Sequence, residues 1–167
     1  MKYVTTFILI LVLAGCAKSY PPLPTVAEVD VQRYLGTWYE IARYEHFFEE
    51  GCSNVTATYT LREDEQIDVL NSCNKEGELT TAHGVAYSTD SSFSKLKVSF
   101  FRPFYGDYQI LMLGDNYEYA VIGEPSREYF WILSRTKKLP QTTLDMILTK
   151  MSSLGYDSRK LIWTPHE

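Results

Sequence analysis

The chain has 167 residues, 45% of them hydrophobic and 14% aromatic, which is enough apolar material for one sizeable core and predicts a single folded domain. Its formal net charge is -5, and it contains no run of lysines or arginines. A nucleic-acid-binding protein needs clustered cations to neutralise phosphates, so we exclude nucleic acid as a partner.

The first residues have the pattern of an export signal. Lys2 supplies a positive charge, and residues 7–14 form an apolar run that is too short to remain as a membrane-spanning helix. The run leads into Leu-Ala-Gly-Cys16, which resembles the lipobox of bacterial lipoproteins. An ordinary signal peptide with an incidental cysteine is the alternative. The resemblance implies removal of residues 1–15 and a lipid on Cys16; because Ala17 rather than Asp follows, it also implies an outer-membrane address on the periplasmic side.

A proline-rich segment follows the cysteine. Three of the seven prolines lie between Lys18 and Pro24, as expected for an extended tether. We therefore divide the chain into a lipoprotein signal peptide at 1–15, a lipidated N-terminus and tether at 16–27, and a folded domain at 28–167.

Export also decides how the remaining cysteines are interpreted. Cys52 and Cys73 are an even pair in an oxidising compartment, where a disulfide is stable. Cys52 heads one candidate strand and Cys73 closes the next, so an antiparallel hairpin would bring them near each other. The chain has no C-x-x-C motif and only three histidines, so we expect no metal and no cofactor.

The segment 36–44 is rich in β-branched and aromatic residues, which predicts a strand that begins at a closely approached glycine. In a regular strand, Trp38, Glu40 and Ala42 would share one face. Arg43 would lie on the opposite face. Both faces are partly apolar, so one should line an interior and the other needs further cover.

Seven more candidate strands follow, with alternating or continuous apolar residues. They cover residues 54–61, 67–73, 79–88, 94–101, 107–113, 118–123 and 129–135. The links between them are short and carry turn-forming residues, including a predicted turn at 103–106. Eight antiparallel strands in sequential order form a sandwich or an up-and-down barrel, and closure into a barrel removes exposed edges.

From residue 139 the apolar spacing changes to that of an amphipathic helix. Its apolar face comprises Leu144, Ile147, Leu148, Met151 and Leu154. Thr142 and Asp145 are spaced like a capping box at its start, and Gly155 is placed to end it. We expect this helix to pack on the outside of the sheet, and a last short strand to follow at 161–164.

These features occur in the order that is typical of one family. A G-x-W motif on the first strand, eight sequential strands, Tyr-Phe-Trp-Ile-Leu-Ser-Arg at 129–135 and one following helix resemble a lipocalin over the whole mature chain. Together with the lipobox, the segments at 36–43, 54–59 and 103–106 resemble the bacterial outer-membrane lipoprotein lipocalins. The resemblance implies an all-β fold: an eight-stranded antiparallel up-and-down β-barrel with one C-terminal α-helix packed on the outside.

The resemblance also assigns structural roles. It implies that Gly36, Trp38 and Arg135 build the closed end of the barrel, with the Arg135 guanidinium packed across the Trp38 ring.

A barrel of eight strands can hold one small ligand when its inward side chains leave room. Small inward residues recur at Ala82, Gly84, Ala86 and Ala120, which favours an apolar cavity over a filled interior. The side chains expected to contact a ligand are Val55, Ala57, Tyr59, Val69, Ala86, Leu96, Val98, Phe100, Tyr108, Ile122, Trp131 and Leu133. Three of them, Tyr59, Tyr108 and Trp131, could offer polar groups to a head group, although ordinary aromatic packing explains each equally well.

Three functions remain open. The resemblance implies a non-catalytic, membrane-anchored protein that binds a fatty acid or lysophospholipid for lipid storage or transport in the envelope. A lipocalin-fold enzyme acting on a lipophilic substrate is the second; the chain has no catalytic motif of the G-x-S-x-G or H-E-x-x-H type, and a disulfide would remove the Cys52 thiolate. A purely structural envelope lipoprotein is the third. The expected partners are the lipid ligand and the outer membrane, and two copies could pair as a homodimer.

Overall fold

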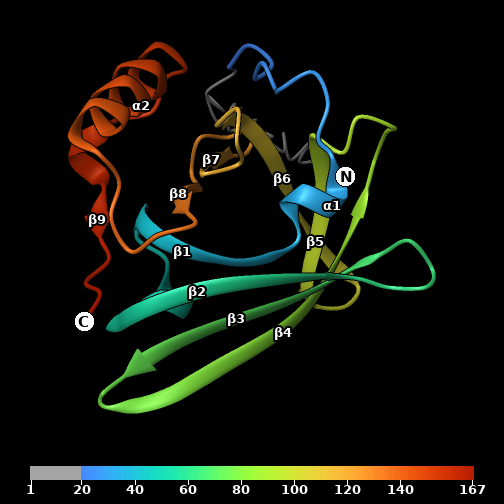
Figure 1. The fold of residues 1–167 in the computed structure, drawn as a ribbon, viewed down its shortest axis with the longest axis horizontal. Coiled ribbons are helices and arrows are strands. Elements are labelled where there is room, and N and C mark those ends of the chain that lie inside the picture. Colours follow the sequence, from blue (N-terminus) through green and yellow to red (C-terminus); the bar gives the residue numbers. More distant parts are fainter. Residues whose placement is uncertain (1–19) are drawn as a thin grey trace, which may run out of the picture.

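The computed structural model describes residues 20–167, so the predicted signal peptide and Cys16 lie outside the described residues. Eight strands form one antiparallel barrel in which sequential strands pair and β1 closes the ring by pairing with both β2 and β8 (Figure 1). The strands are β1 (Gly36–Arg43), β2 (Cys52–Leu61), β3 (Ile67–Lys75), β4 (Glu78–Ser88), β5 (Lys95–Phe101), β6 (Phe104–Leu113), β7 (Tyr119–Gly123) and β8 (Phe130–Ser134). The predicted up-and-down barrel is confirmed.

Four helices and a ninth strand complete the described chain. They are α1 (Val31–Tyr34), η1 (Phe47–Glu49), α2 (Gln141–Ser153), η2 (Ser158–Lys160) and β9 (Ile162–Trp163). The sequence missed α1, η1 and η2, because a helix of one turn is too short to produce an apolar periodicity. No helix within residues 20–167 is both long enough and apolar enough to cross a membrane.

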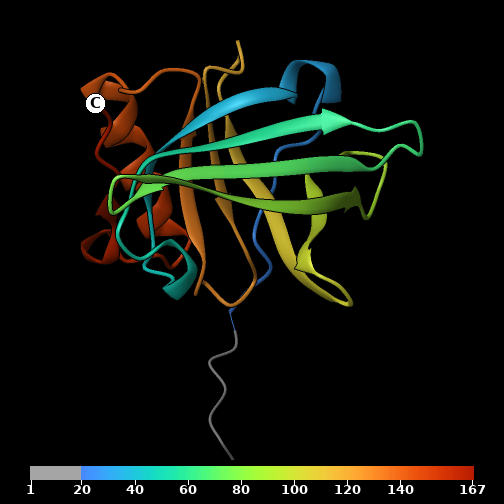
Figure 2. The same cartoon turned by 90° about the horizontal axis from the view of Figure 1, so that it is seen from below.

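The loops at the two ends of the barrel differ in character. Figure 2 shows α1 and the β6–β7 turn on the upper side, and η1, the β5–β6 turn and the β7–β8 loop on the lower side. We call the upper side the closed end and the lower side the mouth.

The predicted turn at 103–106 is wrong: Phe101 already pairs with Phe104, so the chain reverses within two residues and β6 begins earlier than expected.

The predicted alternation of β1 fails after Glu40. The pairing of β1 with β8 slips between Glu40 and Ala42, which marks a β-bulge. Trp38 therefore packs in the barrel interior, whereas Ala42 belongs to the apolar cluster on the outside. The extra residue turns Arg43 back toward Glu40, and the two side chains form an ion pair. A single bulge thus moves a cation, rather than an alanine, to the inner side of the strand.

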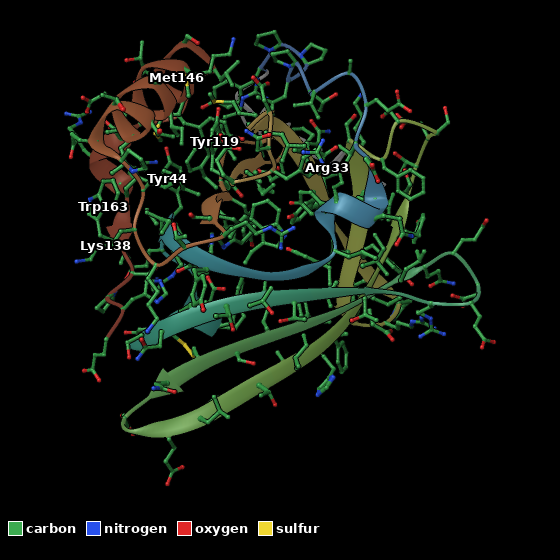
Figure 3. All side chains as sticks on the ribbon, viewed as in Figure 1. Arg33, Tyr44, Tyr119, Lys138, Met146 and Trp163 are labelled. Carbon is green, nitrogen blue, oxygen red and sulfur yellow. A yellow bond between two sulfur atoms is a disulfide. The ribbon has the colours of Figure 1, made fainter. Side chains whose placement is uncertain are left out.

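The helix α2 covers the outer face of the barrel, as predicted. Ile147 and Met151 are buried against the outward side chains of β7 and β8, and Leu144, Leu148 and Leu154 pack at the edge of the same cluster. Figure 3 shows Tyr44 between the helix and the barrel, and Met146 on the side of the helix that faces solvent. β7 and β8 therefore have an apolar layer on each face, the barrel interior on one and the contact with α2 on the other.

The ends of α2 agree only in part with the sequence. The predicted capping box is wrong: Pro140 occupies the N-cap without a side-chain hydrogen bond, and Asp145 instead accepts from the Gln141 side chain at 2.8 Å. Gly155 ends the helix as predicted, with φ +89° and Tyr156 N–H bonded back to the Met151 carbonyl. Gly36 likewise has φ +88°, so it is required by backbone conformation and not by the close approach that we expected.

The C-terminal segment fills a gap in the barrel. β1 pairs with β2 only over 36–39; nearer the mouth, β9 pairs with β1 instead. The Asn54 N–H donates to the Pro165 carbonyl at 2.8 Å, so the segment after β9 also binds β2. The predicted last strand is confirmed, and its pairing with β1 takes the place of the β1–β2 ladder on the mouth side.

Candidate ligand-binding site

The closed end is sealed by Trp38 and Arg135. The Trp38 side chain is fully buried, and its Nε1 donates to the Tyr34 carbonyl at 2.8 Å. The guanidinium carbon of Arg135 lies 3.8 Å from the centroid of the Trp38 ring. Arg135 also donates to the carbonyls of Thr37 at 2.9 Å and Leu35 at 2.9 Å. These bonds satisfy carbonyls at the end of α1 and hold this short helix across the barrel floor.

Three tyrosine hydroxyls meet above this floor. The hydroxyl of Tyr108 is hydrogen-bonded to that of Tyr34 at 2.7 Å and to that of Tyr59 at 3.0 Å. Burial raises the pKa of all three, that of Tyr59 to about 12, so they are neutral. Three O–H donors share two mutual hydrogen bonds, which leaves one hydroxyl proton without a partner inside the cluster. We name Tyr34, Tyr59 and Tyr108 the tyrosine cluster.

Most of the expected ligand contacts do line one interior. Apart from Val55 and Phe100, they all belong to the interior apolar cluster or its edge. Val55 packs with Cys52 and Cys73 in a small cluster of its own. Phe100 is 46% exposed.

The Phe100 ring lies against Gly84, which we expected to leave space for a cavity. A Cβ placed on Gly84 would lie 2.9 Å from the Phe100 ring, so this ring occupies the space that the glycine leaves. Gly84 therefore makes room for an aromatic side chain and does not enlarge a cavity.

The mouth half of the barrel is open to solvent. Residues 78–83 of β4 are all exposed, although alternate side chains of a strand point to opposite faces. Ala82 shares its face with Ala86, which is buried in the interior cluster, so the exposed Ala82 faces the lumen. β4 pairs with β5 only over 85–88, which leaves the mouth half of β4 without a partner on that side. The lumen is thus closed at the floor and accessible at the mouth.

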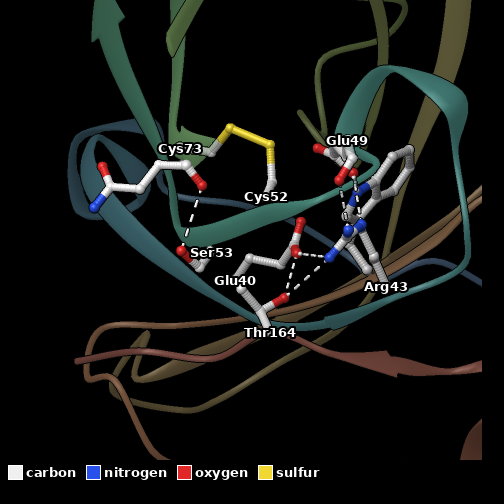
Figure 4. The surroundings of a disulfide bond; sticks show 9 residues. Glu40, Arg43, Glu49, Cys52, Ser53, Cys73 and Thr164 are labelled. Atoms are coloured by element: carbon white, nitrogen blue, oxygen red, sulfur yellow. Dashed lines mark hydrogen bonds and ion pairs between the residues drawn. A yellow bond between two sulfur atoms is a disulfide. The ribbon is translucent and has the colours of Figure 1, made fainter. Parts of the chain in front are cut away.

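A buried ion-pair network borders the mouth (Figure 4). Arg43 Nη1 donates to Glu40 Oε1 at 3.0 Å, and Arg43 Nε lies 3.3 Å from Glu49 Oε2. The Thr164 hydroxyl donates to the Glu40 carboxylate. One buried cation therefore faces two buried carboxylates. Burial raises the pKa of Glu40, and burial together with the Glu40 charge raises the pKa of Glu49 to about 7.

Glu49 connects this network to the lumen wall. The Trp131 indole Nε1 donates to Glu49 Oε2 at 3.4 Å. The His46 ring stacks on Tyr129 with ring centroids 4.5 Å apart, and lies 5.1 Å from the Trp131 ring. Burial lowers the pKa of His46 to about 4, so it is a neutral aromatic surface at pH 7. The polar handle predicted for Trp131 is therefore already bonded to a carboxyl group.

The sequence did not identify Tyr34, Glu49 or Arg43 as parts of the site. Tyr34 belongs to the unpredicted α1, Glu49 to the unpredicted η1, and Arg43 is turned by the β1 bulge.

Within residues 20–167, no group of three or more His, Cys, Asp or Glu side chains is arranged to hold a metal ion. A small void near the floor has a volume of about 10 Å³, room for one water molecule and not for an acyl chain.

The predicted disulfide is present. Cys52 and Cys73 are bonded with their Cα atoms 5.5 Å apart (Figure 4). It joins β2 to β3 at the mouth, where the β2–β3 register slips between Ser53 and Thr56. The bond ties together two strands whose ladder is locally interrupted.

An eight-stranded up-and-down barrel with a sealed floor, an open mouth and one external helix defines the lipocalin architecture. Residues 29–166 match the lipocalin-like domain family. The chain belongs to this family.

Relatives narrow the class further. The chain is 44% identical over 156 residues to the outer membrane lipoprotein Blc of Citrobacter freundii, covering 90% of this chain and 88% of that protein. It is 38% identical to the outer membrane lipoprotein Blc of Vibrio cholerae, with both chains covered completely. The predicted outer-membrane localisation agrees with these names. Among solved structures, insecticyanin of Manduca sexta shares the fold with a TM-score of 0.73 and 22% identity, covering 89% of this chain and 86% of that one.

Proposed function

We propose that this lipocalin is a non-catalytic lipid-binding protein that holds one fatty acid or lysophospholipid in the lumen, and is anchored to the outer membrane through a lipid on Cys16. Family membership supports a role in binding a lipophilic ligand. The observation that carries the proposal is the lumen itself: apolar walls, a sealed floor, and a mouth half in which both faces of β4 are exposed.

The acyl chain would lie between the tyrosine cluster and the mouth. The ten expected contacts in the interior cluster then form its wall, with Leu133 near the floor and Trp131 nearer the mouth. The spare hydroxyl proton of the tyrosine cluster would bond a ligand oxygen that reaches the floor. A head group left at the mouth would meet Trp131, His46 and Tyr129, whose ring faces suit an ammonium group.

Mass spectrometry of organic extracts from natively purified protein tests this function. We expect an acyl lipid in near-stoichiometric amount, unchanged on incubation with the protein. A lumen that yields no lipid, and does not respond to added lysophospholipid, favours a structural role. Progressive conversion of the added lipid into products favours an enzyme.

A further inference from the structure

Arg127 binds Tyr20 and Pro21 beside the mouth of the barrel. This side chain lies in the β7–β8 loop and is only 6% exposed. Its Nη2 donates to the Pro21 carbonyl at 2.6 Å, and its guanidinium carbon lies 4.9 Å from the Tyr20 ring centroid. Its other N–H groups donate to the carbonyls of Leu154 at 3.2 Å and Pro125 at 2.5 Å. We call this arrangement the tether latch.

The latch decides which end of the barrel lies near the anchor. Figure 2 shows the blue start of the described chain beside the β7–β8 loop, on the same side as η1 and the β5–β6 turn. Tyr20 lies four positions after Cys16, and four residues span at most about 14 Å when fully extended. A lipid on Cys16 would therefore keep the mouth, and not the closed end, close to the bilayer surface.

Four phenylalanine side chains on the mouth loops are exposed to solvent, although burial of such large apolar side chains is favourable. Phe47 is 85% and Phe48 50% exposed on η1, and Phe101 is 76% and Phe104 71% exposed at the β5–β6 turn. The Phe101 and Phe104 rings stack with centroids 6.3 Å apart. Large apolar side chains gathered at one end of a protein mark an interaction surface. We call these four residues the mouth phenylalanines.

The charges near the mouth point to an apolar and not an electrostatic contact. Glu45, Glu50 and Glu128 are exposed on the same loops, and Arg102 is an exposed cation between Phe101 and Phe104. Net negative charge at the mouth does not attract anionic lipid head groups. Attachment at this surface would therefore depend on burial of aromatic rings.

We infer that the barrel docks on the membrane mouth-first, with the mouth phenylalanines inserted into the interfacial region of the phospholipid bilayer that holds the anchor. Aromatic rings are favourable at this depth, and a short tether supplies the proximity that four rings alone would not. An acyl chain could then pass between bilayer and lumen without crossing water. The inference rests on the proposed lipidation of Cys16, but not on the identity of the ligand.

Quenching of tryptophan by brominated lipids tests the orientation. The mature lipidated protein is placed in vesicles of phosphatidylethanolamine and phosphatidylglycerol, with bromine on the acyl chains. Phe101→Trp and Phe47→Trp carry a reporter at the mouth, and Asn116→Trp carries a matched reporter on the exposed β6–β7 turn at the closed end. The unaltered protein, with its three tryptophans, gives the background.

We expect the added emission of both mouth reporters to be quenched several-fold more strongly than that of Asn116→Trp. A higher share of phosphatidylglycerol should not increase the quenching of the mouth reporters. Equal quenching of all three reporters overturns the inference. Mouth reporters that are blue-shifted but unquenched also overturn it, because they would show the mouth phenylalanines buried between two copies of the chain. Vesicle flotation measures lipidation separately, and lipid extraction measures ligand binding.

A separate variant tests whether the tether latch orients the barrel on the membrane. Arg127→Ala in the Phe101→Trp background removes both the bond to the Pro21 carbonyl and the contact with the Tyr20 ring, so it should reduce quenching while flotation is unchanged. Phe47→Ser with Phe48→Ser should reduce it as well. Unchanged quenching in both variants shows that neither feature orients the barrel.

Discussion

Arg135 closes the floor of the barrel by packing over the Trp38 ring, with its guanidinium carbon 3.8 Å from the ring centroid. The same guanidinium donates to the carbonyls of Arg33, Leu35 and Thr37. It therefore joins α1, β1 and the end of β8 through one side chain. The floor is a single arginine-centred junction and not simply an apolar plug.

Removing this junction should destabilise the fold. We expect Arg135→Gln to lower the free energy of unfolding by about 1–3 kcal/mol, because partly buried carbonyls at the end of α1 lose their donor and the indole loses its cation. Urea denaturation measures the change. Arg135→Lys keeps the charge but cannot reach all the carbonyls, so its free energy of unfolding should lie between those of the unaltered protein and Arg135→Gln. A midpoint for Arg135→Gln equal to that of the unaltered protein contradicts this role.

The disulfide should contribute substantially to stability. Cys52 and Cys73 are 21 positions apart, for which loop-closure entropy gives roughly 3 kcal/mol. The double variant Cys52→Ala with Cys73→Ala should lose about that amount in urea denaturation, and a reducing agent should destabilise the unaltered protein equally. Two free thiols titrated in unreduced, unfolded protein would show that the bond does not form.

Glu49 should make stability depend on pH. Its pKa is raised from 4.5 to about 7 in the folded protein, first by burial and then by the Glu40 charge. Between these values the folded state binds more protons than the unfolded state, so the free energy of unfolding falls as the pH rises from about 4.5 to about 7. Glu49→Gln should remove part of this slope.

Urea denaturation at several pH values gives the slope. Trp131 emission should change over the same range, because its indole N–H is bonded to Glu49. The unaltered protein and Glu49→Gln are compared directly, since Glu40 and other groups titrate in both. Identical slopes rule out a shifted Glu49.

The tyrosine cluster predicts an order of effects. Tyr108→Phe removes the hydroxyl that both neighbours bond, so we expect it to cost about 1–3 kcal/mol of stability. Tyr59→Phe removes one bond and leaves Tyr108 paired with Tyr34, so it should cost less. Equal costs, measured by urea denaturation, would mean that water in the lumen replaces the lost bonds.

The lumen wall gives the test of ligand binding. Leu133 is 4% exposed in the interior cluster, and a carboxylate there would face the proposed acyl chain without a partner. We expect Leu133→Glu to weaken lysophospholipid binding, measured by titration of tryptophan emission. Trp131→Phe keeps an apolar wall, so it should bind while losing most of the emission change.

Circular dichroism establishes whether Leu133→Glu folds. If it does not, Leu133→Phe narrows the lumen without a charge and should discriminate against longer chains. Unchanged affinity in a folded Leu133→Glu variant places the ligand elsewhere.

Local patterns in the sequence indicated the strands, their sequential order, the helix on the outside and Cys52 with Cys73 as the candidate disulfide, whereas the choice of a barrel over a sandwich came from the resemblance to a family. Periods of two and 3.6 residues, turn residues and the spacing of cysteines depend on neighbours in the chain, and the physical preferences behind them act over a few residues. The alternation grouped the side chains of each strand by face, and the family's topology indicated which face points inward.

Only the tertiary structure decided where those patterns break and which distant residues meet. The bulge after Glu40 turns Arg43 into the ion-pair network, a one-residue change that no periodicity reveals. Tyr34 reaches Tyr108 across 74 positions, and Arg127 reaches Pro21 across 106. These contacts exist because closure of the barrel brings its first and last segments together, so the floor, the mouth and the tether latch are properties of the closed ring and not of any single segment.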